Sequence, residues 1–134
     1  MAFTEPEFQL SEEDLDRRTH VICVSGEIHV STAPEFQRRL EAAISRGKTA
    51  VVLDLTETEF IDSTGLSVIL NGLRRVTRQR GRMAIVCRNP TVRRLFEITR
   101  LDSTFDIHET REDALRTARA GYVATADGSS DAAP

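Results

Sequence analysis

The sequence has few residues that form disulfides or bind metals, and those few are not grouped. There are two cysteines and three histidines in 134 residues, with no Cys-x-x-Cys pair and no histidine cluster. Cys23 and Cys87 each lie within an apolar run, which favours two buried free thiols in a reducing cytoplasm. His20 and His108 fall near predicted strand ends, far in sequence from any carboxylate pair that would suggest a metal site, and we interpret them as structural. We therefore predict no metal site.

The chain also lacks a long apolar segment and an excess of charge. No apolar run approaches the length of a membrane span, and the first seven residues, Met-Ala-Phe-Thr-Glu-Pro-Glu, are acidic and lack the apolar segment of a signal peptide. The formal net charge is −3, which gives no general affinity for nucleic acid or membranes. We predict a cytoplasmic protein without membrane insertion. Arg74, Arg75 and Arg78 have no interleaved aromatic residues, so we interpret them as a solvated helix face, with an acidic partner surface as the alternative.

Signatures of catalysis are missing as well. The chain has no Gly-x-x-x-x-Gly-Lys-Ser/Thr phosphate-binding loop, and no nucleophile, base and orienting residue stand at a motif spacing. We therefore predict no catalytic activity and no cofactor. A minor alternative is a small nucleotide-binding enzyme.

What the sequence does contain is a regular alternation of strand and helix patterns. Short apolar runs predict strands at 8–10, 20–25, 50–55, 83–87 and around 105–107. Residues 11–18 read as a charged turn, and Gly26 is expected to end the second strand. Helical periodicity follows Ser31 or Thr32, the stretch 62–65, Asn89-Pro90, and Thr110. This order predicts an α/β fold with a mixed, mostly parallel sheet of four to five strands, an antiparallel edge, and about four helices.

Apolar stripes on the predicted helices indicate which faces meet the core. The first helix has Phe36, Leu40, Ala43 and Ile44, and it stops at Gly47. The core-facing side chains of the later helices are as follows: Leu66, Ile69, Leu70, Leu73 and Val76; Val92, Leu95, Phe96 and Ile98; Ala114, Leu115 and Ala118. Residues 1–7 form an N-terminal extension, 8–120 the domain, and 121–134 a small, polar and acidic tail that we predict to be disordered.

Function is expected where two strand-to-helix loops open at one end of the sheet. The loops 26–32 and 62–65 each follow a strand and precede a helix, so both lie at carboxyl ends of strands. Ser63 and Thr64 at a helix start have two interpretations. They are a helix cap and nothing more, or they include a phosphorylation site, since a helix N-terminus stabilises a phosphate.

Four motifs in order resemble the STAS domain, and in particular its free-standing bacterial form, the anti-sigma factor antagonist. They are Gly26-Glu27-Ile28 leading to Thr32-Ala33-Pro34; Leu53-Asp54-Leu55; Phe60-Ile61-Asp62-Ser63-Thr64-Gly65-Leu66; and Val92-Arg93-Arg94-Leu95-Phe96-Glu97-Ile98. The resemblance implies a STAS-like fold and a partner switch. The unmodified antagonist binds an anti-sigma factor that is also a serine kinase, which frees a sigma factor. Phosphorylation ends that complex, and a PP2C-type phosphatase reverses it.

Carried over by position, the resemblance makes Ser63 the phosphoacceptor, with Thr64 as the secondary candidate, while Asp62 and Gly65 shape the loop. The predicted partner-binding residues are His29, Val30, Ser31, Thr32, Asp62, Ser63, Thr64, Gly65 and Leu66. His29 stands where the family usually has Asp. It is either a surface residue without a special role, or it changes partner choice or makes binding weakly pH-sensitive. We expect a monomer or weak dimer. The alternative function is a non-switching STAS subunit of a transporter or stress-sensing complex.

Overall fold

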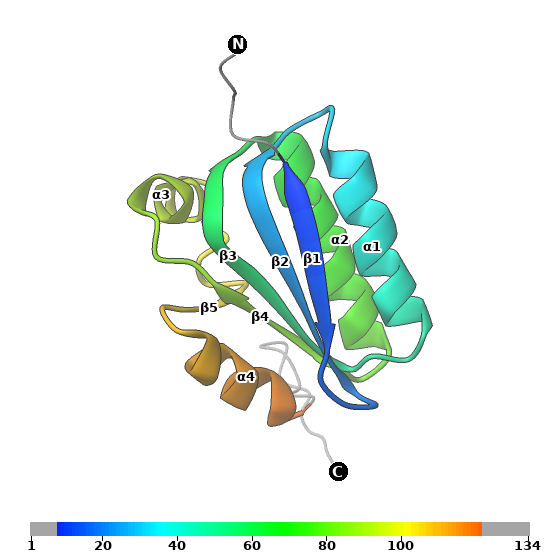
Figure 1. The fold of residues 1–134 in the computed structure, drawn as a ribbon. Coiled ribbons are helices and arrows are strands. Elements are labelled where there is room, and N and C mark those ends of the chain that lie inside the picture. The colour runs from blue at the N-terminus through cyan, green and yellow to red at the C-terminus, as the bar shows by residue number, and fades with distance from the viewer. Residues whose placement is uncertain (1–7, 122–134) are drawn as a thin grey trace.

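Between residues 8 and 121, five strands form one sheet and four helices pack on its two faces. The computed structural model describes residues 8–121 (Figure 1). The elements are β1 (Gln9–Asp14), β2 (Thr19–Ile28), α1 (Ala33–Ser45), β3 (Ala50–Ile61), α2 (Ser63–Arg78), β4 (Arg82–Val86), α3 (Pro90–Ile98), β5 (Asp106–His108) and α4 (Arg111–Arg119). The predicted order of elements is confirmed. The predicted extension 1–7 and all but the first residue of the predicted tail 121–134 lie outside the described residues.

The sheet has the order β1-β2-β3-β4-β5, with β1 antiparallel to β2 and every other pair parallel. This confirms the mixed sheet with one antiparallel edge. The larger core cluster lies beneath α1, α2 and α3, and a smaller one of mostly small side chains lies beneath α4 on the opposite face. Buried Val, Ile and Leu on both faces of the central strands explain their continuous apolar runs.

Three strands end at least three residues later than the sequence predicts. Ser11–Asp14 belong to β1 rather than to a turn, because the antiparallel pairing with β2 continues as far as Asp14, which lies opposite His20. Gly26 does not end β2. It takes a positive φ of 96°, and the pairing of β2 with β3 shifts register beside it. β3 continues to Ile61, which carries the chain to the site.

One predicted core residue is on the surface. Ile98 is 66% exposed, whereas Val92 and Phe96 of the same helix are fully buried. Ile98 follows Val92 by six positions, which places it about 120° from Val92 around the helix at about 100° per residue. The prediction for Ile98 is therefore wrong, and the helix faces the core along a narrower stripe.

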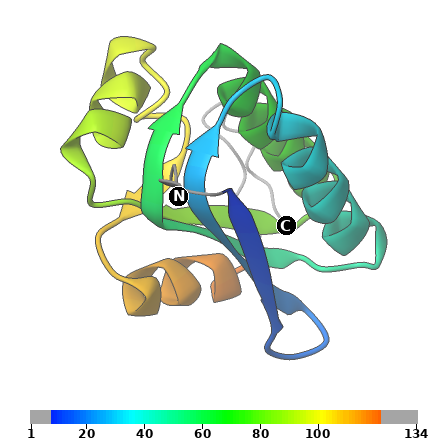
Figure 2. The same ribbon diagram turned by 45° about the horizontal axis from the view of Figure 1, so that its top comes forward.

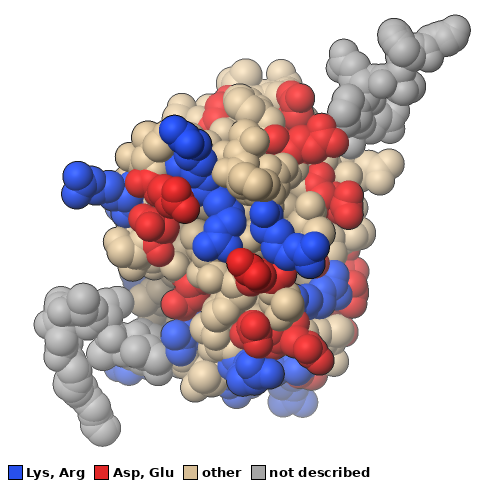
Figure 3. Space-filling model, turned by 90° about the vertical axis from the view of Figure 1, so that its left-hand side faces the viewer, with Lys and Arg blue, Asp and Glu red and all other residues tan. Residues whose placement is uncertain are grey.

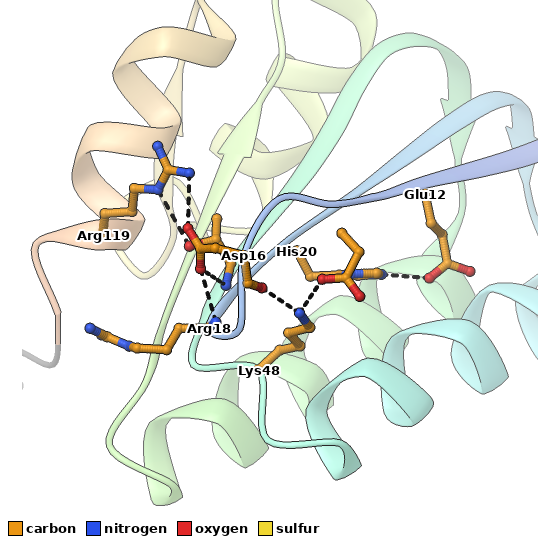
Figure 4. A network of polar contacts seen from close by, with 8 residues as sticks. Glu12, Asp16, Arg18, His20, Lys48 and Arg119 are labelled. Atoms are coloured by element: carbon orange, nitrogen blue, oxygen red, sulfur yellow. Dashed lines mark hydrogen bonds and ion pairs between the residues drawn. The ribbon is translucent and has the colours of Figure 1, made fainter.

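A polar network links the β1–β2 turn to the amino end of β3 (Figure 4). Lys48, the only lysine of the chain, is 5% exposed, pairs with the Asp14 carboxylate and donates to the Asp16 carbonyl oxygen at 2.6 Å. The Asp16 carboxylate accepts from the Thr19 backbone N–H at 2.8 Å and pairs with Arg119 of α4 at 3.3 Å. One ammonium group thus ties the β1–β2 turn to the start of β3.

The neighbouring His20 is buried, and its Nε2 lies 2.6 Å from the Glu12 carboxylate. Glu12 also pairs with Arg39 of α1 at 2.5 Å. Burial alone would raise the pKa of Glu12, but the hydrogen bonds with His20 and Arg39 lower it overall. These contacts agree with a structural role for His20, far from the carboxyl ends of the strands.

We expect Lys48→Met to lower the midpoint of urea unfolding at pH 7, because the Asp16 carbonyl loses its buried donor. The hydrogen bond from Lys48 also lowers the pKa of Asp14. A lowered pKa stabilises the fold above the unfolded-state pKa, and that contribution is lost as the pH falls through the folded-state pKa. The difference in urea midpoint between the wild type and Lys48→Met should therefore narrow below about pH 4. Equal urea midpoints at pH 7 would contradict this role of Lys48.

Candidate functional site

The carboxyl ends of β2 and β3 lie side by side, and each leads into a helix (Figure 2). Ile28 is paired with Ile61, and the Asp62 backbone N–H donates to the Ile28 carbonyl oxygen at 3.0 Å. The loops 29–32 and 62–65 are therefore adjacent at one end of the sheet, as the sequence predicts.

Asp62 caps α2. Its backbone is extended, with φ −100° and ψ −174°, and its carboxylate accepts from the Gly65 backbone N–H at 3.0 Å. Ser63 and Thr64 follow in the first turn, and both are exposed. Within residues 8–121, neither hydroxyl has a hydrogen-bond partner. Because Asp62 supplies the cap, the interpretation of Ser63 as a helix cap is wrong.

Gly65 seats the start of α2 directly on the two strand ends. A Cβ at this position would lie 2.7 Å from Cγ2 of Ile28 and 2.9 Å from Cγ2 of Ile61, closer than carbon atoms pack. Leu66 is only 7% exposed and belongs to the core. Two residues of the predicted partner surface, Gly65 and Leu66, therefore support the loop from below, while Ser63 and Thr64 face solvent.

The loop 29–32 is held by Thr32. Its Oγ1 accepts from the His29 backbone N–H at 2.9 Å and donates to the Glu27 carbonyl oxygen at 2.8 Å. Thr32 occupies the N-cap position of α1, but its side chain accepts no hydrogen bond from that helix. The predicted capping side chain instead closes the loop on itself.

His29 takes part in the same loop. Its Nδ1 accepts from the Ser31 backbone N–H at 3.2 Å, and its Nε2 lies 3.9 Å from the Glu27 carboxylate. An accepting Nδ1 places the proton of the neutral ring on Nε2, on the side of Glu27. Ser31 is exposed, and Val30 is 69% exposed.

Phe60 is a member of this surface that the sequence analysis missed. It is the penultimate residue of β3, is paired in register with Glu27, and is 43% exposed. Alternation along β3 was the available signal, because Ile61 points into the core and its neighbour must point away. Val30 in the loop 29–32 and Phe60 near the end of β3 are thus two large apolar side chains exposed close in sequence to the site.

A second polar cluster lies on the sheet face that α4 covers only in part. Arg111 pairs with Asp54 at 3.1 Å and with Glu13 at 2.7 Å, and its Nη2 lies 3.0 Å from the Cys23 sulfur. Cys23 is only partly buried, so the prediction of two buried thiols holds for Cys87 alone. Burial nevertheless raises the pKa of the Cys23 thiol, which keeps it protonated. This cluster is internally paired.

Neither a metal cluster nor a membrane span is found in the described part of the chain. No group of three or more His, Cys, Asp or Glu side chains there is arranged to hold a metal ion. No helix between residues 8 and 121 combines the length and apolar character needed to cross a bilayer. The face bearing α3 and α4 shows interleaved acidic and basic side chains (Figure 3).

Residues 14–114 match the family model of the STAS domain. The chain belongs to the STAS domain family. This STAS domain is 30% identical over 103 residues to the anti-sigma-F factor antagonist RsfB of Mycobacterium tuberculosis, across 77% of this chain and 84% of the relative. The resemblance seen in the sequence motifs is thereby confirmed.

Solved structures agree with this assignment. An anti-sigma factor antagonist from Mycobacterium paratuberculosis superposes with a TM-score of 0.77 at 34% identity, covering 84% of this STAS domain and 95% of that chain. The anti-sigma factor antagonist SpoIIAA in its unphosphorylated form gives 0.72 at 27% identity, covering 85% and 97%. The Bacillus SpoIIAA is also known in the phosphorylated form, which gives 0.64 at 27% identity and covers 83% and 98%.

Proposed function

We propose that this STAS domain is an anti-sigma factor antagonist of the bacterial cytoplasm that is switched off by phosphorylation of Ser63. In the unphosphorylated state it binds an anti-sigma factor that is also an ATP-dependent serine kinase, and so frees a sigma factor. The kinase phosphorylates Ser63, the complex dissociates, and a PP2C-type phosphatase restores the starting state. The domain itself catalyses no reaction. The names of its relatives support the antagonist role.

The observation that carries the proposal is the state of the Ser63 hydroxyl. It is exposed, and it makes no hydrogen bond to any described residue because Asp62 already caps the helix. A kinase can therefore reach the hydroxyl without unfolding the helix start. The helix dipole and the backbone N–H groups at the start of α2 favour a phosphate at this place.

The negative charge of a phosphate on Ser63 opposes binding of a partner. A phosphate adds about −1.5 to −2 charge next to the Asp62 carboxylate. In a complex, these negative groups would be brought out of water against a surface shaped for a neutral hydroxyl, and this repulsion and desolvation oppose binding. The switch then changes affinity through local electrostatics and leaves the fold unchanged.

We expect purified kinase and ATP to phosphorylate the wild-type chain once, at Ser63, and to leave Ser63→Ala unmodified. Thr64→Ala is the matched control, since it removes the adjacent exposed hydroxyl and should be phosphorylated like the wild type. Intact-mass and fragment-mass spectrometry measure the sites. Stoichiometric phosphorylation of Ser63→Ala would contradict the assignment. A wild-type chain that binds its partner but is never modified would favour a non-switching subunit.

A further inference from the structure

A groove lies along α2 on the flank turned away from α1. It has a volume of about 480 Å³ and is more apolar than polar. We call it the α2 groove, and its lining residues are Leu70, Leu73, Arg74, Thr77, Arg78, Leu101 and Thr104. The opposite flank of α2 is closed by α1, because a Cβ on Gly72 would come within 2.5 Å of a Leu40 methyl group.

The groove continues the helix face that carries Ser63. At about 100° per residue, Leu70 lies about 20° from Ser63 around the helix, and Arg74 about 20° on the other side. With a rise of about 1.5 Å per residue, the stripe runs about 20 Å from Ser63 to Thr77. A single partner helix can therefore contact the phosphorylation site at one end and the groove at the other.

In the described part of the chain, two arginines on the same edge of the groove lack a carboxylate partner. Within residues 8–121, neither Arg74 nor Arg78 forms an ion pair or hydrogen bond, and both are exposed. Two nearby arginines, Arg75 on the same helix and Arg82 just after it, do have polar partners. Arg75 donates to the Ser45 hydroxyl at 3.2 Å, and Arg82 pairs with Asp106 at 3.2 Å. The groove therefore offers an apolar floor of leucines beside two uncompensated positive charges.

We propose that the α2 groove is a docking site for an acidic amphipathic helix of the anti-sigma factor, in addition to the surface around Ser63. The inference rests on the proposed function. Leucine-sized side chains of that helix would fill the space between Leu73 and Leu101, and carboxylates along its edge would pair with Arg74 and Arg78. A second copy of this chain fits less well, because a two-fold axis through the groove would bring like charges together.

Charge reversal provides the test. The anti-sigma factor that binds the wild-type chain is titrated by calorimetry with the double variant Arg74→Glu/Arg78→Glu. We expect binding at least tenfold weaker, with a smaller dependence on salt. The matched control is Arg17→Glu/Arg46→Glu, which reverses two exposed arginines at the other end of the strands and should bind like the wild type. Thermal unfolding by circular dichroism confirms that each variant is folded.

A cross-linking experiment identifies the occupant. Exposed Thr104 is replaced by p-benzoylphenylalanine, and the complex is irradiated and analysed by mass spectrometry. We expect a cross-link to an acidic amphipathic segment of the anti-sigma factor, and none from the same replacement at Arg17. A cross-link to a segment of other character, or none from Thr104, overturns the proposal.

The remaining outcomes separate this inference from the proposed function. If Ser63→Asp weakens binding and the Arg74/Arg78 variant does not, the switch stands and the groove proposal is overturned. If the Arg74/Arg78 variant weakens binding and Ser63→Asp does not, the groove proposal stands and the switch fails. If no anti-sigma factor binds the wild-type chain, both fail. Loss of phosphatidylserine-vesicle binding or of self-association in the Arg74/Arg78 variant would assign the groove to a membrane or a second copy, and overturns the proposal.

Discussion

Ser63→Asp is expected to weaken binding of the anti-sigma factor by at least about thirtyfold, or about 2 kcal/mol, whereas Ser63→Ala retains the complex. A buried unpaired charge at a protein interface typically costs about 2–5 kcal/mol. Alanine removes only a hydroxyl that has no partner among the described residues. Isothermal titration calorimetry with the purified anti-sigma factor measures both variants.

The control for this prediction adds the same charge at another helix start. Thr91→Asp places a carboxylate on an exposed residue in the first turn of α3. We expect this variant to bind like the wild type. Both aspartate variants should also melt no lower than the wild type, because a negative charge is favourable at a helix N-terminus. Equal affinities of Ser63→Asp and Ser63→Ala would contradict an electrostatic switch at this position.

Phe96→Ala is expected to lower the free energy of unfolding by about 3–5 kcal/mol, the usual cost of removing a buried aromatic ring. Phe96 is fully buried, and its ring meets that of Phe105 edge to face with centroids 5.6 Å apart. Its carbonyl oxygen also accepts from the Leu101 backbone N–H at 2.8 Å. Urea denaturation followed by circular dichroism measures the loss.

Phe60→Ala is the matched control, and it should weaken partner binding while leaving stability nearly unchanged. Phe60 is 43% exposed at the site, so its loss should change stability by less than about 1 kcal/mol. We expect it to weaken binding of the anti-sigma factor about tenfold, because exposed aromatic side chains often dominate interfaces. Phe96→Ala, measured at a temperature where it is folded, should bind nearly like the wild type. A Phe60→Ala variant that binds normally would exclude Phe60 from the interface.

The sequence was a good guide to the elements and a poorer guide to their ends. Periodicity located every strand and helix because each buries a face, and burial leaves its pattern in the residues. It failed where polar residues continue a strand. Thr58 in β3 is fully buried, but its hydroxyl donates to the Val24 carbonyl oxygen at 2.8 Å, a partner that only the folded sheet supplies. The polar and acidic residues Ser11–Asp14 likewise predict a turn from sequence, although they belong to β1.

The site was predictable in its location and less so in its members. Parallel strands bring their carboxyl ends together, so the meeting of the loops at His29 and Ser63 followed from topology. The capping roles did not follow, because Asp62, Ser63, Thr32 and Ser31 all suit a cap by residue type. Which side chain accepts the helix N–H groups depends on backbone angles that residue type leaves open. The exposure of Phe60 depends on β3 continuing past its predicted end.

The polar network around Lys48 and the loop beside Ser63 stand at opposite ends of β3, a strand of 12 residues. Substitutions in the loop 29–32 therefore leave the anchoring of the sheet untouched. A cell that keeps several duplicated domains of this kind can diversify the loop of each copy without loss of folding. Signalling pathways built from such copies can in this way become separate from one another, because each domain can be matched to its own partner.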